Sequence, residues 1–452
     1  MGTSDSTPTP PFNNPYKGNI RSPKDLLDDD DAIIIQRNFS YGSLPVRNYK
    51  TAHGRDIESD NPPSILTPSQ QPQLEDFVID TSKRLYTAPY WAKWSVVPPN
   101  SINPEARYGH FYCNVSDNVD IGSNVNSPLS YVGYGQSDDI TYLATDHIWQ
   151  FDSNLRKWTK LKLTGHTISK RSDSCSVIVG NLIYIFGGKC ENKYFADFHT
   201  ININTNVVTL IQATGHAPHP MAGAFMASYD NKIFIWGGFN GKIVNKSLFI
   251  YDTFTKSWHS KVLDIEGRYN AASTYYQNYM YIYGHADSKK DGCKLVMIDL
   301  QAQEANYVTT TGKGPISDHM YGRMTKIGQY LFYFGGKAKN AFTMLYALDL
   351  ERMWWFLVHI RPDNDTVTVN DGRINESGFF LIPRFHSFGC CFSRARREII
   401  AFLGYPVSKI PCLFILGIGT ALGVINLRND MLDVMAYEFE NNEDDLEMAI
   451  PT

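Results

Sequence analysis

The feature that most constrains this chain is an internal repeat of two strand-like runs that end in a pair of glycines. The clearest copy reads SCSVIVGNLIYIFGG at 174–188, and residues 224–238 and 324–336 follow the same plan. Each copy has a turn with Asn or Gly between runs of β-branched and aromatic residues, which predicts a β-hairpin. The paired glycines permit backbone angles with φ > 0 and a close approach of neighbouring chain.

Weaker copies end at the pairs Tyr134-Gly135, Gly284-His285 and Gly404-Tyr405, which gives six copies in all. The first five are 47–53 residues apart, and the sixth follows after 69 residues because of a polar insertion at 363–378. Downstream of most copies a third run ends in Asp and a fourth carries Trp, as at Asp152 with Trp158. A period near 50 residues with four short strands predicts an all-β propeller of six four-stranded blades.

On these motifs the chain resembles the kelch β-propeller family, in which galactose oxidase is an enzyme relative, over roughly residues 90 to 440. In the sixth blade we expect the first two strands at 385–392 and 398–403 and the third at 431–437. No fourth strand follows, whereas residues 91–97 with Trp91 and Trp94 look like one. We therefore expect this N-terminal strand to complete the last blade and close the ring.

The chain divides into three parts by composition. Residues 1–85 hold 10 of the 23 prolines among polar and acidic residues, a composition that predicts a disordered arm. We expect residues 86–440 to form the propeller and residues 441–452 to form an acidic tail. In the arm, Gly2 fits a loose myristoylation pattern and Ser40 a short kinase pattern, which makes them candidates for modification. The apolar stretch 410–425 is shorter than the roughly 20 residues of a spanning helix, so we expect it to be buried or covered by a partner.

Charge and cysteine usage narrow the class of protein. A net charge of −4 argues against a general nucleic-acid binder, and 43% hydrophobic residues exclude a wholly disordered chain. The seven cysteines form no C-x-x-C pair, and the N-terminus lacks the apolar stretch of a secretory signal. We expect reduced thiols, no cofactor and a cytoplasmic location, with the nucleus or the membrane periphery left open.

One position leads into the first strand of each blade, 16 residues before the first glycine of the pair. It holds Arg171, Met221, Arg268 and His319, and by motif we add Arg107 and Arg384 for the first and sixth blades. The resemblance implies that arginines at such positions line the channel mouth and bind acidic or phosphorylated segments, which guanidinium groups pair in a bidentate way. Alternatively, these arginines bond carbonyl groups of the next blade and hold the ring together.

The sequence therefore favours a monomeric, non-enzymatic scaffold that binds protein partners at Arg107, Arg171, Arg268, His319 and Arg384. Signalling, cytoskeletal and ubiquitin-ligase assemblies stay open as its setting. The alternative is an enzyme acting on a sugar or small metabolite in the channel. We predict no catalytic or metal-binding residue, because no ligand set of the copper- or iron-binding relatives carries over; Phe195 stands where the iron type needs a carboxylate between Glu191 and His199.

Overall fold

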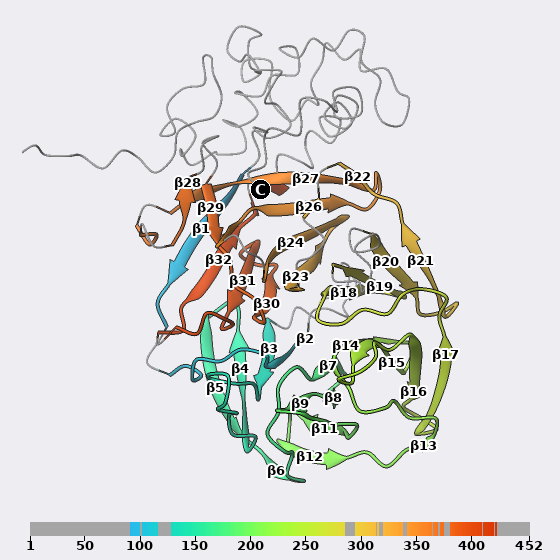
Figure 1. Ribbon diagram of the computed structural model, residues 1–452. Coiled ribbons are helices and arrows are strands. Elements are labelled where there is room, and N and C mark those ends of the chain that lie inside the picture. Colours follow the sequence, from blue (N-terminus) through green and yellow to red (C-terminus); the bar gives the residue numbers. More distant parts are fainter. Residues whose placement is uncertain are drawn as a thin grey trace, which may run out of the picture.

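The computed structural model describes residues 91–99, 102–115, 128–284, 294–312, 314–315, 320–337, 341–363, 365–368, 371–374, 380–408, 410–419 and 421–422. These residues form six four-stranded antiparallel blades arranged around a central channel (Figure 1). The prediction of a six-bladed propeller is confirmed. The proposed arm and tail, with Gly2 and Ser40, lie outside the described residues, so the limits at 85 and 440 stay predictions.

The first three blades follow the chain in order from the innermost strand outward. Blade one has β2 (Phe111–Asn114), β3 (Leu129–Gly133), β4 (His147–Asp152) and β5 (Lys157–Lys162). Blade two has β7 (Cys175–Val179), β8 (Leu182–Phe186), β11 (Phe198–Asn202) and β12 (Val207–Leu210). Blade three has β14 (Ala222–Tyr229), β15 (Lys232–Phe239), β16 (Ser247–Asp252) and β17 (Ser257–Val262).

The last three blades repeat this order, except that the sixth takes its outer strand from the beginning of the described chain. Blade four has β18 (Ala272–Tyr276), β19 (Tyr279–Tyr283), β20 (Leu295–Asp299) and β21 (Glu304–Val308). Blade five has β23 (Met320–Ile327), β24 (Tyr330–Lys337), β26 (Leu345–Asp349) and β27 (Trp354–Pro362). Blade six has β30 (Gly389–Ser393), β31 (Glu398–Phe402), β32 (Leu413–Gly417) and β1 (Trp91–Val97).

Shorter strands lie outside the outer strands, in a loop of blade two and in a small separate sheet. Three two-residue strands lie outside outer strands: β6 (Thr164–Gly165), β13 (Thr214–Gly215) and β22 (Thr311–Gly312). β9 (Lys189–Cys190) pairs with β10 (Lys193–Tyr194) in a loop of blade two. β25 (Phe342–Thr343), β28 (Arg373–Ile374) and β29 (Phe380–Pro383) form a small sheet that includes part of the insertion before blade six.

Apolar packing between neighbouring blades holds the ring together. Six clusters of buried residues each fill one gap between two consecutive blades. Outer-strand tryptophans take part: the ring of Trp158 lies 5.3 Å from that of Phe402 on blade six, and Trp258 lies 5.1 Å from Phe198 on blade two. Such aromatic pairs explain why the fourth strands so often carry Trp.

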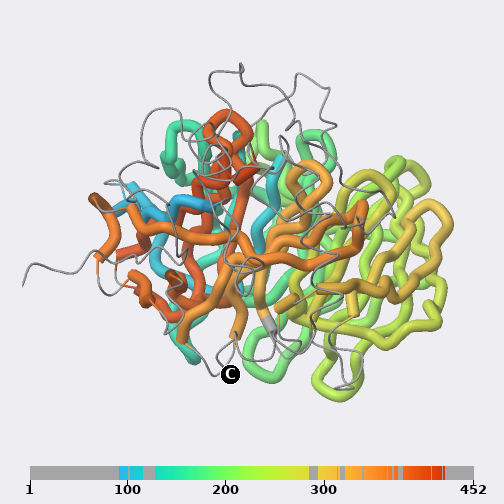
Figure 2. The backbone as a smooth tube through the Cα atoms, turned by 90° about the horizontal axis from the view of Figure 1, so that it is seen from above, coloured from blue at the N-terminus to red at the C-terminus, as the bar shows by residue number. Residues whose placement is uncertain are grey.

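The N-terminal strand closes the ring, as the sequence predicted. β1 pairs antiparallel with β32 from Lys93↔Gly417 to Val97↔Leu413, and in Figure 2 the blue N-terminal segment lies among orange and red C-terminal segments. The structure adds a link that the sequence did not indicate. β1 also pairs in parallel with β27, from Trp91↔His359 to Trp94↔Pro362, and so joins blades five and six into one nine-stranded sheet.

The expected third strand of blade six at 431–437 is wrong, because β32 takes that place; residues 431–437 themselves lie outside the described residues. β32 belongs to the apolar stretch 410–425, and Leu413, Ile415 and Leu416 are buried, as expected for that stretch. A strand covered on both faces has a continuous apolar run rather than alternation, which hid it from the pattern analysis. Among the described residues no helix is long and apolar enough to cross a membrane.

Candidate partner-binding site

One side of the propeller collects the loops that vary most from blade to blade. In an antiparallel blade, the loops from second to third strand and the links from fourth strand to the next blade emerge on the same side. We call this side the loop face; its described parts include 102–110, 134–146, 163–174, 187–197, 211–221, 240–246, 263–271, 403–408 and 410–412. The turns between first and second and between third and fourth strands lie on the opposite face.

A closed circle of backbone hydrogen bonds surrounds the channel at the loop face. One residue from each blade takes part, and each N–H donates to the carbonyl of its counterpart in the preceding blade, over 2.5–3.3 Å. The six residues are Gly109, Asp173, Gly223, Asn270, Tyr321 and Ser387, and all six have positive φ, between 52° and 67°. Four of them carry side chains in a conformation that usually favours glycine, so the ring imposes the backbone angle.

A second set of backbone bonds fixes the lead-in positions. The N–H of Gly135 donates to the carbonyl of Arg171 (2.9 Å). In four further pairs a glycine N–H likewise donates to the carbonyl of a lead-in residue: Gly188 to Met221, Gly238 to Arg268, Gly336 to Phe385 and Gly404 to Arg107. The alignment of Arg107, Arg171, Met221 and Arg268 is thereby confirmed. In blade six the equivalent position is Phe385, one residue after Arg384, because counting by motif fails beside an insertion. His319 lies outside the described residues.

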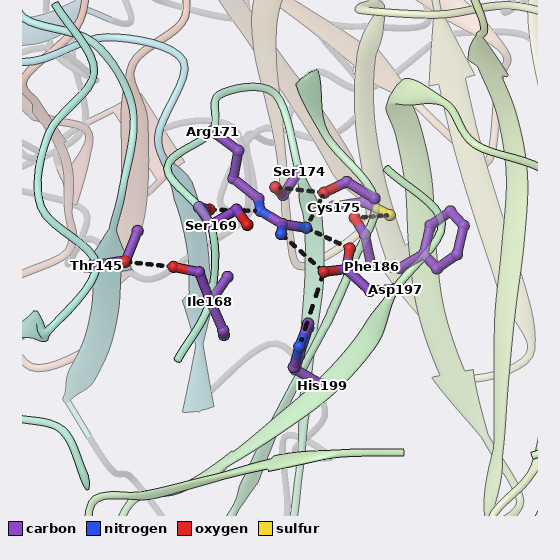
Figure 3. A network of polar contacts seen from close by, with 10 residues as sticks. Thr145, Ile168, Ser169, Arg171, Ser174, Cys175, Phe186, Asp197 and His199 are labelled. Atoms are coloured by element: carbon purple, nitrogen blue, oxygen red, sulfur yellow. Dashed lines mark hydrogen bonds and ion pairs between the residues drawn. The ribbon is translucent and has the colours of Figure 1, made fainter. Parts of the chain in front are cut away.

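The lead-in arginines are buried and already bonded. The side chain of Arg171 is 0% exposed; its guanidinium donates to the Asp197 carboxylate at 2.5 and 2.7 Å and to the carbonyl of Gly187 at 3.0 Å (Figure 3). Arg107 donates to the carbonyl of Tyr134 at 3.1 Å and to the carboxylate of Glu105. Burial lowers the pKa of Arg107 to about 10, against the opposing effect of Glu105.

Arg268 and Arg384 complete this set in two different ways. Arg268 is fully buried and donates to the carbonyl of Ile282 in its own blade. Arg384 reaches into blade five, where it donates to the carbonyls of Gly335 and Phe342, each at 3.2 Å. A partner carboxylate could reach Arg107, Arg171 or Arg268 only if these internal bonds were given up. The bonds favour a structural role for these arginines, but they lie within one blade and not on carbonyls of the next blade as expected. The blades are linked here through the backbone, because the carbonyls of Arg107, Arg171 and Arg268 accept from glycine N–H groups of the preceding blade.

The channel below the ring is polar and holds a cavity of about 150 Å³. Asp173 lies at its wall with Lys189 at 3.5 Å, and burial raises the pKa of the Asp173 carboxyl. Arg323 donates to the carbonyl of Phe388 at 2.6 Å and lies over the ring of Tyr112, so it spans blades five, six and one. His110 is buried, with no hydrogen-bond partner among the described residues, and burial with the charges of Arg107 and Arg323 holds its pKa well below 6.5.

Aromatic side chains gather around the mouth of this channel. On one side His386 stacks on Tyr405 at 4.9 Å, and Tyr108 and Tyr321 pack against this pair. On another side Phe239 stacks on Tyr269 at 5.0 Å, with Tyr194 against its edge. Tyrosine at such a rim offers a large contact area together with a polar hydroxyl, a composition typical of protein interfaces.

Exposed apolar side chains concentrate on the same face. Of nine large hydrophobic residues exposed in the described part of the chain, five lie on the loop face: Ile102, Ile140, Ile243, Tyr405 and Ile410. Ile140, Ile243 and Ile410 lie in equivalent loops of blades one, three and six, each between the second and the third strand of its blade. No group of three or more His, Cys, Asp or Glu side chains in the described ranges is placed to hold a metal ion.

Sequence reasoning missed the ring of positive-φ residues, Arg323 and the aromatic mouth. The ring had a partial signal, since Gly, Asp and Asn, which tolerate positive φ, stand two residues after the lead-in position in blades one to four. No sequence pattern pointed to Arg323, because the equivalent residues in the other five blades are apolar or small.

Comparison with known proteins agrees with this architecture. Residues 124–267 match the family described as the KLHDC2/KLHL20/DRC7 Kelch-repeats domain. Kelch domain-containing protein 3 of Rattus norvegicus is 24% identical over 42% of this chain and 53% of its own length. Acyl-CoA-binding domain-containing protein 4 of Arabidopsis thaliana is 24% identical over 44% of this chain and 32% of its own length.

Host cell factor 2 of Homo sapiens is 24% identical over 35% of this chain and 22% of its own length. The chain spans about half the length of the kelch domain-containing relatives that it matches. The matched repeats and the six four-stranded blades lead to one conclusion: the chain folds as a kelch-type β-propeller, and residues 124–267 are similar to the kelch-repeat family.

Proposed function

We propose that this protein is a non-enzymatic interaction scaffold that binds an extended segment of a partner protein across the loop face of its propeller. The observation that carries the proposal is the convergence of exposed isoleucines and an aromatic rim on one face. Interfaces draw most of their binding energy from a few well-packed aromatic and apolar anchors. Similarity to the kelch-repeat family agrees with this role.

We assign separate roles to the anchors and to the arginines. Tyr405 and Ile410 on blade six, with Ile140 and Ile243 on blades one and three, would contact the partner directly. Lead-in arginines would hold the loops in place. For an acidic or phosphorylated segment, the exposed Lys193 on the blade-two loop and the exposed Lys242 on the blade-three loop would supply accessible cations, whereas Lys189 is paired with Asp173 at 3.5 Å.

The finer setting is also part of the proposal. We place the scaffold in the cytoplasm, with the propeller as a monomer, in a signalling, cytoskeletal or ubiquitin-ligase assembly. A partner binding the loops leaves the opposite face and the outer strands available for further contacts, as a scaffold requires.

Quantitative affinity purification with loop-face variants tests the proposal. The variant Ile140→Asp, Ile243→Asp, Ile410→Asp places three charges on the loop face without touching a buried residue. The matched control is Leu155→Asp with Phe254→Asp, which are equally exposed (70% and 77%) but lie on turns of the opposite face. We expect the triple variant to lose a discrete set of proteins that the control retains. Equal retention by both variants would overturn the proposal.

A further inference from the structure

Three blades cover the free edge of their outer strand with a short piece of the preceding link. β6 pairs in parallel with β12, β13 with β17, and β22 with β27. In blade two, the N–H of Thr164 donates to the carbonyl of Asn206 and the N–H of His166 to that of Val208, both at 3.0 Å. We call these pieces edge caps: Thr164–Gly165, Thr214–Gly215 and Thr311–Gly312.

All three edge caps have the same sequence, and the glycine has a steric reason. A Cβ added to Gly165, Gly215 or Gly312 would lie 2.5, 2.2 or 2.3 Å from the carbonyl oxygen of Val208, Trp258 or Trp355. The glycines also have φ between 76° and 88°. Only glycine allows the cap to approach the outer strand this closely.

Blade four has no edge cap, and the length of its link explains why. Between β5 and Arg171 the link is 163–170, whereas between β17 and Arg268 it is only 263–267, three residues shorter and without Thr-Gly. Among the described residues β21 pairs with β20 alone. Its N–H and C=O groups on the outer side therefore form an open edge, the kind of surface that accepts an added strand.

The other outer strands differ from β21. β1 has no free side, because β27 and β32 flank it. β5 of blade one has an uncapped edge in the described part of the chain but carries Lys157, Lys160 and Lys162, and lysines protect edges against pairing. β21, with sequence EANYV, has no such protection.

The equivalent positions define where a strand would bind. In each capped blade, the outer-strand residue next to the cap glycine lies opposite one residue of the third strand. These pairs are Val208 with Ile201, Trp258 with Tyr251 and Trp355 with Leu348. In blade four the equivalent pair is Ala305 with Ile298. The outward carbonyls of Asn206 and Val208 thus correspond to those of Gln303 and Ala305. In a strand the N–H of a residue points to the same side as its C=O, so the N–H of Ala305 is outward too.

We propose that the outer edge of β21 is a second docking site, which binds an extended Thr-Gly-containing segment of a partner protein as a parallel strand. In the described part of the chain, every strand added outside an outer strand runs parallel: β6, β13, β22, and β1 on β27. Two copies related by a two-fold axis would pair antiparallel, which favours a different protein. His166 and His216 follow the glycine in two caps, and the exposed Glu304 of β21 would suit a basic residue there. This edge lies apart from the loop face, and the proposal does not depend on the proposed function.

Hydrogen exchange at single-amide resolution tests the open edge. In the full-length protein alone, the amide of Ala305 should exchange at least about tenfold faster than those of Val208, Trp258 and Trp355, whose outward sides are capped. The probe is the chain's own cap sequence, the synthetic peptide Lys-Leu-Thr-Gly-His-Thr, with its ends blocked. At millimolar concentration we expect it to slow the exchange of Ala305 several-fold. The same peptide with Val in place of Gly should have no effect.

Two variants keep the proposal falsifiable. Ala305→Pro removes only an outward N–H, which an edge strand tolerates, and should abolish the peptide effect while exchange in the other blades is unchanged. Insertion of Thr-Gly-His after Leu263 should cap the edge internally, protect Ala305 and also abolish peptide binding. An Ala305 amide as protected as its counterparts, or no peptide effect on the unmodified chain, would overturn the proposal. Protection that appears only with concentration-dependent dimerisation would assign the edge to a second copy and would likewise refute it.

Discussion

Replacing Arg171 by alanine tests whether the lead-in arginines have a structural role. The guanidinium is fully buried and bonds both oxygens of Asp197, the carbonyl of Gly187 and the carbonyl of Ser169. Truncation leaves a carboxylate without its cation and an internal space beside Phe195, whose ring lies 4.0 Å from the guanidinium. Removing one partner of a buried ion pair costs about 3–5 kcal/mol. Asp197 is 30% exposed and the Gly187 carbonyl keeps a bond from Ser174, so we expect the lower end, about 3 kcal/mol.

This loss is measurable by thermal and urea unfolding. For roughly 330 residues of propeller, an unfolding entropy of about 2.1 cal/mol/K per residue converts about 3 kcal/mol into a Tm lower by about 4 °C. Asp197→Asn keeps an acceptor for Arg171 and should cost less, and Lys170→Ala, an exposed neighbour, should stay within about 0.5 kcal/mol of the parent. An Arg171→Ala protein of unchanged stability that had lost partners would refute the structural role and restore Arg171 as a binding residue.

Three further perturbations test the fold. Removing residues 1–85 should leave stability unchanged, whereas removing 1–97 also deletes β1 with Trp91 and Trp94 and should open the last blade; equal melting of the two would disprove closure by β1. Gly188→Ala should lower the free energy of unfolding more than Gly180→Ala does. Both glycines have positive φ, but a Cβ at Gly188 would lie 2.7 Å from the Ser172 carbonyl, whereas Gly180 faces open space. Equal losses of stability would contradict the close approach at Gly188. Burial lowers the pKa of His199 to about 4, so between about pH 6.5 and 4 only the unfolded chain takes up a proton at this histidine. The free energy of unfolding should therefore fall as the pH drops through that range, and it should fall less steeply in His199→Gln. Urea midpoints of both proteins at pH 7 and pH 5 would show this difference.

The blade plan was predictable because its signals are local. Glycine pairs, alternating strands and outer tryptophans recur in each copy, and the missing fourth strand of the last blade identified 91–97 as its substitute. The parallel link from β1 to β27 was not predictable, because nothing local in residues 354–362 indicates a second neighbour. β32 was missed because its run LFILG is apolar throughout and lacks the period of a half-buried strand.

The candidate site was predictable only in part. The lead-in positions follow from counting, but residue type does not tell whether a guanidinium faces solvent or carbonyl groups, and the structure buries Arg107, Arg171 and Arg268. The backbone ring includes Tyr321 and Ser387, whose types do not favour positive φ; their conformation comes from neighbours in adjacent blades. The aromatic mouth joins residues from several blades, so its existence depends on closure of the whole ring.

The most direct test of the central claim is hydrogen exchange on the purified complex with a partner that the opposite-face control retains. The loop-face account predicts slower exchange in loops 134–146, 240–246 and 403–412, whose tips carry Ile140, Ile243 and Ile410. Turns 153–156 and 253–256 on the opposite face should exchange as in the free protein. Protection confined to those turns, with unchanged loops, would contradict the claim that partners bind the loop face.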